Sequence, residues 1–341
     1  MHCRAVELNR SIHRQQATPD TQGSEPHPGQ MRHDKEILIR MPVLARRQDA
    51  KRLGLSEYAL SGRGDTAQPF PGVYIHPSET EPLRVPSWVD DHWLDIHTRV
   101  RALQLQRPDA VVSHATAAFL LGWPIPYVVR GPIDVTTPRS RMRRAGVRGH
   151  GPRDVATAVH RGVMMARQSE VLRGISASST PRQLITVLDT ICGRWHGPPA
   201  AHPDDIRKMI EDSPRFRGSE ALRTALASAR AGVDSPRETD LRLLIVAAGL
   251  PEPVVAHPVR FDDETLHPDL SYPELRIAIE YEGEHHRTDP RQWDIDIVRE
   301  RVFREAGWEY IRVTQSTRPE TIIRLIRSAL ERRRGTVSRA A

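Results

Sequence analysis

Two carboxylates stand two residues apart in an apolar run near the C-terminal end of the chain. Residues 276–283 read Arg-Ile-Ala-Ile-Glu-Tyr-Glu-Gly, and their alternation predicts a β-strand with Glu280 and Glu282 on one face. Neighbouring acids on so apolar a strand repel each other and lose hydration together unless a cation lies between them. A hard divalent metal ion is the simplest such cation, because it prefers oxygen ligands.

Further polar residues of the right types lie close by in the sequence. Asp269 is upstream, where a second short strand can bring it beside Glu280, and His285 and His286 follow a glycine turn. Acids can hold a metal ion, and a histidine can transfer a proton near neutral pH. Together these residue types favour cleavage of phosphodiester bonds.

The segment that carries these residues predicts a compact α/β unit, beginning at a capping box. Ser235 is the expected N-cap, Pro236 the first helical residue and Glu238 the reciprocal partner. Residues 233–334 then predict a mixed sheet flanked by helices. The expected order is a helix to Ala248, strands at 254–261, 267–270 and 275–282, a helix at 296–306, a strand at 308–313 and a helix at 319–334.

The upstream residues predict an α+β region that opens with a degenerate winged helix at 34–80. Its parts are a helix from Ile37 to Gly54, a short helix from Ser56 to Leu60 and a wing strand from Pro71 to Ile75, used for packing or for DNA contact. Residues 81–232 follow. Their expected elements are helices at 88–105, 113–121, 180–191 and 203–231, a strand at 128–135 and an Arg-rich turn at 138–146 before a further strand.

The Arg-rich turn at 138–146 has two interpretations. It is a nucleic-acid patch, or a solvated hairpin tip whose charges keep a sheet edge soluble. The second is the more common use of such charges.

Composition sets the broad class of protein. The chain has 341 residues, a net charge of +7 and a pI of about 9.9, which predicts two folded units and a phosphate-bearing partner. Charges of both signs are interspersed, so an ordinary solvated surface is an alternative explanation for the basic net charge. The chain has two cysteines, Cys3 and Cys192, which lie too far apart in the sequence for a disulfide framework or a Cys-based zinc site. A protein with no disulfide framework suits the reducing cytoplasm.

The two ends of the chain are expected to be flexible tails, at 1–33 and 335–341. The first has no apolar signal-peptide segment, and Met31 is an alternative start. The most apolar later stretch, 110–129, is interrupted by histidine and proline and is too short for a bilayer, so no membrane role is expected.

At these motifs the chain resembles the very-short-patch-repair-like (Vsr-like) endonucleases of the PD-(D/E)xK superfamily, in particular an uncharacterised actinobacterial branch. The likeness spans residues 234–330. It is carried by Ser-Pro-Arg-Glu at 235–238, His-Pro-Asp at 267–269, Ile-Glu-Tyr-Glu-Gly-Glu-His-His at 279–286, Trp-Asp-Ile-Asp at 293–296 with Arg299, and Gly-Trp at 307–308. Residues 112–118 resemble an AbiEi-type antitoxin region. The resemblance implies a restriction-endonuclease-like fold for the C-terminal domain.

The resemblance also implies roles for individual residues. Asp269 and Glu280 are the metal-binding acids, and Glu238 completes the set. Glu282 departs from the superfamily pattern, because it stands where the motif usually has a lysine. A fourth acid adds a ligand and makes the chemistry more dependent on a cation, and His286 or Arg299 would replace the missing positive group.

The expected function is hydrolysis of DNA phosphodiester bonds by a Mg²⁺- or Mn²⁺-dependent endonuclease. Asp269 and Glu280 would hold the ion, with a second ion shared by Glu282 and Glu238. His286 would move a proton. Arg287 and Arg299 would bind phosphate. The alternative is a non-catalytic, antitoxin-like or regulatory DNA-binding protein with a degenerate nuclease fold, and a third possibility is a toxin-like nuclease inhibited by its own N-terminal region.

Each candidate residue also has a structural explanation. Glu238 fits a capping box, Asp269 follows a proline as turn residues do, and the histidines suit a surface position. Arg299 has Glu300 or Asp296 within reach on its own helix. Glu280 with Glu282 would be tolerated on an edge strand with one wet face.

Overall fold

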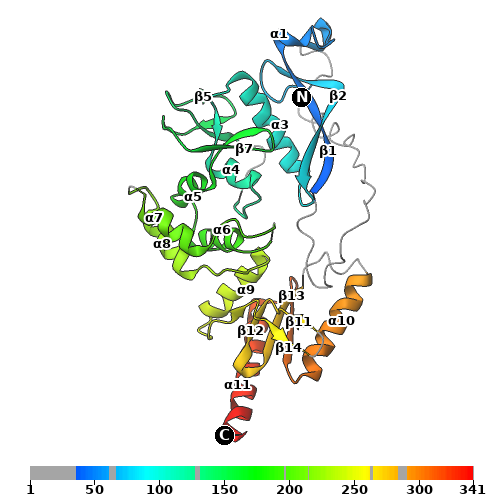
Figure 1. The fold of residues 1–341 in the computed structure, drawn as a ribbon, viewed down its shortest axis with the longest axis vertical. Helices are drawn as coiled ribbons and strands as arrows, with labels where there is room; N and C mark the ends of the chain where they lie inside the picture. Colours follow the sequence, from blue (N-terminus) through cyan, green and yellow to red (C-terminus); the bar gives the residue numbers. More distant parts are fainter. Residues whose placement is uncertain are drawn as a thin grey trace. The chain divides into compact units, whose positions relative to one another are not determined.

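The computed structural model describes residues 36–60, 67–126, 131–195, 197–213, 215–261, 264–282 and 290–340. Contacts divide the chain into two units. Of the described residues, the first unit takes those in Arg32–Gln183 and Met209–Arg223, and the second takes Leu184–Lys208 and those in Thr224–Ala341. Both units combine helices and strands (Figure 1). No helix in the described ranges has the length and hydropathy needed to cross a membrane.

The first unit begins with a long antiparallel ribbon. Strand β1 (Glu36–Arg46) pairs with β2 (Val73–Pro86), and the short helices α1 (Arg47–Ala50) and α2 (Glu57–Leu60) lie between them in the chain. The helix expected from Ile37 to Gly54 is therefore wrong for most of its length. Ile39 and Met41 alternate as buried residues of a strand, and the partner that fixes this conformation lies far along the chain. Helix α2 and the start of strand β2 lie close to the positions expected for the second short helix and the wing strand.

A six-stranded sheet forms the remainder of this unit, in the order β5-β6-β4-β3-β8-β7. The helices expected at 88–105 and 113–121 are α3 and α4, whereas the segment β7-β8-α5 was not expected. The elements are α3 (Asp91–Gln106), β3 (Val111–Val112), α4 (His114–Leu120), β4 (Ile133–Thr136), β5 (Arg143–Arg144), β6 (Val147–Gly149), β7 (Thr157–His160), β8 (Val163–Ala166) and α5 (Gln168–Ser176).

Three helices follow, close to the positions expected for them. They are α6 (Pro181–Cys192), α7 (Pro203–Glu211) and α8 (Ser219–Ser228). The division between the two units crosses α6, α7 and α8, so the second unit contains most of α6 as well as the C-terminal segment.

The second unit is built on a four-stranded mixed sheet in the order β14-β13-β12-β9, in which only β13 and β14 are parallel. Helix α11 runs past its expected end at Arg334 and through most of the segment expected to be a flexible tail. The elements are α9 (Pro236–Ala247), β9 (Val254–Val255), β10 (Val259–Arg260), β11 (Thr265–Leu266), β12 (Leu270–Tyr272), a 3-10 turn (Pro273–Leu275), β13 (Ile277–Glu282), α10 (Pro290–Glu305), β14 (Glu309–Thr314) and α11 (Pro319–Ala340).

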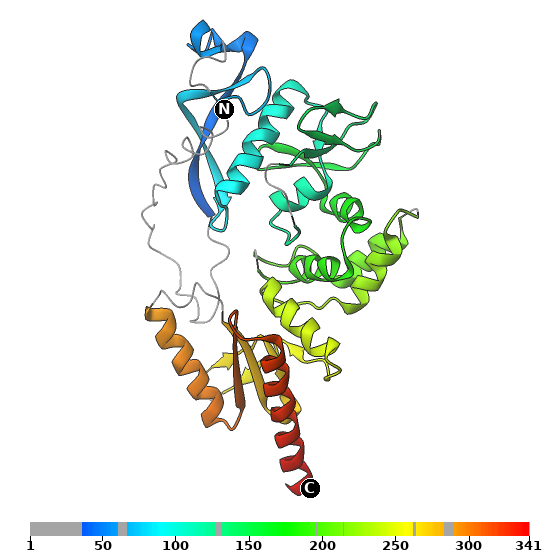
Figure 2. The same cartoon turned by 180° about the vertical axis from the view of Figure 1, so that it is seen from behind.

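Helices cover both faces of this sheet (Figure 2). On one face Ile277 and Ile279 pack against apolar residues of α9 and α11. On the other, Ala278 packs with Phe303 of α10. The predicted alternation along β13 is confirmed, and it places Glu280 on the α10 side of a strand with a hydrogen-bonded neighbour on each edge.

Candidate active site

Asp269 and Glu280 come together where β12 begins beside β13. Leu270 of β12 pairs with Ile279 of β13, so Asp269, the residue before β12, lies opposite Glu280 on the same face. The Tyr281 backbone N–H donates a hydrogen bond of 2.7 Å to Asp269 Oδ2, which holds that carboxylate at the end of the β12-β13 pair. The short strand expected at 267–270 begins only at Leu270, yet Asp269 still lies beside Glu280.

Glu280 receives a guanidinium from the covering helix. Arg299 of α10 places Nη2 at 2.8 Å and Nε at 2.9 Å from Glu280 Oε1, and it also donates to the His267 carbonyl oxygen. Both side chains are mostly buried, with 18% of Arg299 and 15% of Glu280 exposed. Glu300, one of the local partners considered for Arg299, pairs with Arg304 and Arg312 instead.

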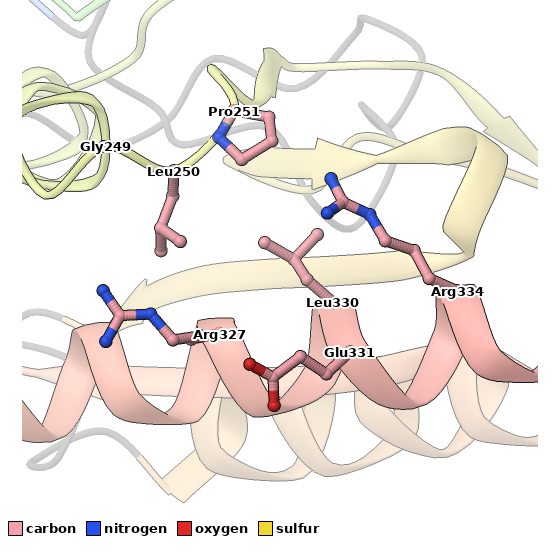
Figure 3. Close-up of a pocket in the computed structure, with 7 residues that line it drawn as sticks. All are labelled: Gly249, Leu250, Pro251, Arg327, Leu330, Glu331 and Arg334. Atoms are coloured by element: carbon pink, nitrogen blue, oxygen red, sulfur yellow. The ribbon is translucent and has the colours of Figure 1, made fainter.

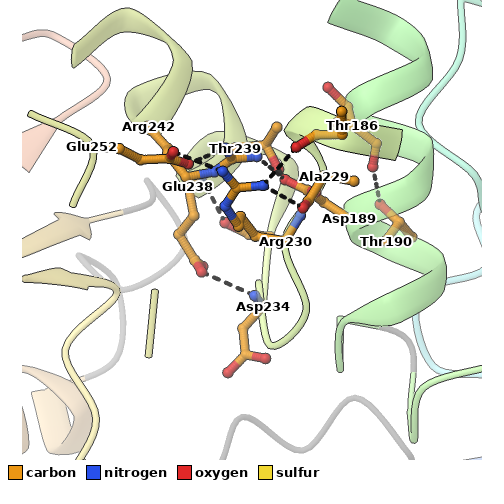
Figure 4. A network of polar contacts seen from close by, with 12 residues as sticks. Thr186, Asp189, Thr190, Ala229, Arg230, Asp234, Glu238, Thr239, Arg242 and Glu252 are labelled. Atoms are coloured by element: carbon orange, nitrogen blue, oxygen red, sulfur yellow. Dashed lines mark hydrogen bonds and ion pairs between the residues drawn. The ribbon is translucent and has the colours of Figure 1, made fainter. Parts of the chain in front are cut away.

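Glu238 takes part in the cap at the start of α9. Its Oε2 accepts a hydrogen bond of 2.9 Å from the backbone N–H of Asp234, the residue before the N-cap (Figure 4). Its own N–H donates to Ser235 Oγ at 3.3 Å, so the cap differs from the expected capping box only in the N–H that the carboxylate binds. Burial raises the pKa of Glu238 to about 8. The charges of Asp234 and Glu280 add to this shift, against the hydrogen bonds from Asp234 and Ser235.

Asp269 is part of the same electrostatic cluster. Burial raises its pKa well above the ordinary value, and the charges of Glu280 and Glu238 raise it further. The Tyr281 N–H and Arg299 act in the opposite direction. Asp269 and Glu280 therefore share the Arg299 guanidinium in a buried position, where a second negative charge is stabilised by a proton or by another cation.

Glu282 continues the acidic face of β13 toward a second arginine. Arg312 of β14, which lies beside Glu280 in the parallel register, places Nη1 at 3.9 Å from Glu282 Oε2. The next residues include His285, His286 and Arg287, which lie outside the described residues. Their expected roles in proton transfer and phosphate binding remain predictions.

The donor set of Asp269 and Glu280 suits a hard divalent cation. Within the described ranges, no group of three or more His, Cys, Asp or Glu side chains is placed to hold a metal ion, so the four expected acids do not form a ready-made cage there. Mg²⁺ usually takes one or two carboxylates and completes its octahedron with water and substrate phosphates. Two adjacent carboxylates fit that pattern.

Stability is expected to depend on pH through Glu238. The folded chain holds this proton more tightly than the unfolded chain, with a pKa of about 8 against an ordinary 4.5. The stability that the Glu238 proton contributes is complete below about pH 4.5 and is lost as the pH rises through about 8. Glu238→Gln keeps an acceptor for the cap but does not titrate. Urea unfolding in EDTA should therefore show a smaller loss of stability between pH 5 and pH 8 for this variant, by on the order of 2 kcal/mol. Parallel pH profiles for the two proteins would contradict the shift.

A buried ion pair positions the helix that carries Glu238. Asp189 Oδ2 of α6 contacts Arg242 Nη2 of α9 at 2.7 Å, and only 0% and 1% of the two side chains are exposed. Thr239 donates to the same carboxylate, and Arg242 Nη1 reaches Glu252 at 2.9 Å (Figure 4). Sequence reasoning missed this pair. A weak signal exists in the single acid among the apolar residues 184–192.

A surface depression in the same unit lies away from the acids. It has a volume of about 520 Å³ and is formed by the loop after α9 and by α11 (Figure 3). Arg327, Glu331 and Arg334 line it together with apolar residues. None of the candidate acids contributes to it, so it is not the candidate active site.

Comparisons with known proteins give relatives for only part of the chain. No protein-family model matches the sequence. The chain is similar to two Mycobacterium tuberculosis proteins, "Uncharacterized protein MT2308" of strain CDC 1551 / Oshkosh and "Uncharacterized protein Rv2248" of strain H37Rv. Each is 28% identical over 108 residues, which is 31% of this chain and 40% of the relative. The match thus spans about two fifths of each relative.

Proposed function

We propose that this protein is a metal-dependent endonuclease that hydrolyses DNA phosphodiester bonds, with a restriction-endonuclease-like domain at its C-terminal end. The observation that carries the proposal is the pair Asp269 and Glu280. Asp269 directly precedes β12 and lies beside Glu280 of β13, in a mixed sheet covered by helices on both faces. The raised pKa of Asp269 supports it, because a buried acid beside like charges is often functional.

Asp269 and Glu280 would hold Mg²⁺ or Mn²⁺. When bound, the ion supplies water activation and neutralisation of phosphate charge. Arg299 fixes the Glu280 carboxylate from α10, and the Tyr281 N–H fixes Asp269. His286 for proton transfer and Arg287 for phosphate binding belong to the same proposal.

The test combines cleavage and metal binding. Purified protein is expected to nick supercoiled plasmid with Mg²⁺ or Mn²⁺ and to stop in EDTA. Calorimetric titration with Mn²⁺ should show a site that Asp269→Ala removes, because that variant deletes one of the two carboxylate ligands. Cutting that continues in EDTA, or an Mn²⁺ site unchanged by the substitution, would count against the assignment.

A non-catalytic DNA-binding protein is the second candidate, and one contact favours it. Arg299 already supplies a positive charge to Glu280 at 2.8 Å, as a nuclease fold without its metal would require. In that case Mn²⁺ titration gives no heat attributable to Asp269. Both proposals share three further features. These are a degenerate winged helix formed by the ribbon β1-β2 with α1 and α2, an AbiEi-like upstream region and a cytoplasmic location.

A further inference from the structure

Basic residues gather on one hairpin of the first unit. Residues 135–153 contain six arginines and no acidic residue. All but one of the six are exposed, and Arg144 is partly buried. The set is Arg139, Arg141, Arg143, Arg144, Arg148 and Arg153, and residues 139–153 are referred to below as the basic hairpin.

Two of these arginines face each other across the strands. Arg143 of β5 pairs directly with Arg148 of β6 in the antiparallel register, an arrangement of like charges that is destabilising. Arg148 is 56% exposed and reaches Asp134 only at 3.4 Å. No hydrogen bond or ion pair joins the Arg143 guanidinium to the side chain or backbone of any residue that the structure describes. Asp134 therefore offsets part of the positive charge of Arg148, whereas no carboxylate among the described residues offsets that of Arg143.

The hairpin is held firmly beneath these charges. Arg144 stacks over Phe70 at 5.0 Å from the ring centre, and Arg141 Nε donates to the Gly149 carbonyl oxygen at 2.7 Å. His150 Nε2 lies 2.9 Å from Asp134 Oδ1, and Asp134 is buried. Arg143 and Arg148 thus project from an anchored support, which reduces the entropy lost on binding.

Protection of a sheet edge does not explain the pattern. Strand β5 is the edge of the six-stranded sheet, and charged residues do discourage edge pairing. However, charges of either sign serve that purpose, and opposite charges on paired residues would serve it without the repulsion. An external anion between Arg143 and Arg148 would remove the repulsion instead.

We propose that the basic hairpin binds the phosphate backbone of duplex DNA, with a phosphate between Arg143 and Arg148. Guanidinium groups bind phosphate oxygens through charge-assisted hydrogen bonds, and such contacts position a protein on DNA independently of sequence. The inference rests on the proposed function for its partner, and it gives the endonuclease a DNA-holding surface outside the unit that carries the acids.

The experiment measures binding of a fluorescent DNA duplex by anisotropy in EDTA over a series of salt concentrations. Arg143→Glu is expected to raise the dissociation constant by about five- to tenfold at moderate salt and to reduce the salt slope by about 1 to 2. Its melting temperature should be unchanged or higher, because the introduced carboxylate would lie opposite Arg148. Weaker binding by an equally stable protein would support a contact with DNA rather than a structural role.

Arg182→Glu is the matched control, because it makes the same change of charge at an exposed position in the first turn of α6. It should shift the dissociation constant by no more than about twofold. Equal effects of the two substitutions, no effect of Arg143→Glu, or tighter binding of an RNA duplex of the same length would each overturn the proposal. Because binding is measured in EDTA, it does not depend on cleavage. If the protein binds DNA through Arg143 but never cuts it, only the proposed nuclease activity is refuted. If Arg143→Glu changes neither nicking nor binding, only the proposed DNA contact of the basic hairpin is refuted.

Discussion

Replacing Glu280 by glutamine is expected to slow metal-dependent plasmid nicking by about 100- to 1000-fold, since a metal ligand contributes several kcal/mol to charge stabilisation in the transition state. Glutamine retains the size of the side chain and an oxygen that can accept the hydrogen bond from Arg299, so the fold should persist. Alanine would also stop cutting, but it would leave the Arg299 guanidinium without its 2.8 Å partner. Initial rates with Mg²⁺ and with Mn²⁺, together with thermal unfolding, provide the measurement.

Glu305→Gln is a suitable control for this substitution. Glu305 lies at the end of α10, pairs with Arg301 and is 64% exposed, so its neutralisation should leave nicking within about twofold of the wild type. Nicking by Glu280→Gln at the control's rate would remove Glu280 from the metal site. Loss of activity in both variants would show that the assay responds to the net charge of the protein.

Replacing Arg242 by methionine is expected to lower the free energy of unfolding by about 3 to 5 kcal/mol, because it leaves Asp189 buried without its ion pair. Burial already raises the pKa of Asp189, against the opposing effect of Arg242. Urea unfolding followed by circular dichroism measures the change. If Arg242→Met does not fold, a double variant that removes both charges and does fold leads to the same conclusion, that the unpaired Asp189 carboxylate causes the loss of stability.

The double variant Asp189→Leu with Arg242→Met tests the cause. Exchange of a buried ion pair for apolar side chains of similar volume is often neutral or stabilising, so the second substitution should restore most of the lost stability. A double variant as unstable as Arg242→Met alone would mean that packing around Arg242, rather than the unpaired carboxylate, accounts for the loss.

Much of the second unit was predictable because its signals are local. Ser235 is the expected N-cap and accepts from the Glu238 N–H, and the alternation along 277–282 correctly assigns the two faces of β13. Gly307, expected as a C-cap, has a positive φ of 76° two residues after the end of α10. Each feature depends on residues only a few positions apart, which is the range over which sequence patterns are informative.

The remaining features depend on partners far apart in the chain. Residues 37–46 have a helix-compatible pattern, but pairing with β2 makes them a strand. The contact of Arg299 with Glu280 joins residues 19 positions apart through the packing of α10, and Asp189 meets Arg242 over 53 positions. Nothing in the local spacing of these residues distinguishes a tertiary partner from a solvated charge.

The ion pair between Asp189 and Arg242 constrains how this chain can evolve. The carboxylate comes from α6, and the guanidinium comes from the segment that carries the candidate catalytic acids. Recombination could join the segment that carries Arg242 to a different upstream segment. The buried guanidinium would then lack the Asp189 carboxylate that neutralises it. The two segments are therefore expected to be inherited together, and a lineage that changes one of these residues should change the other.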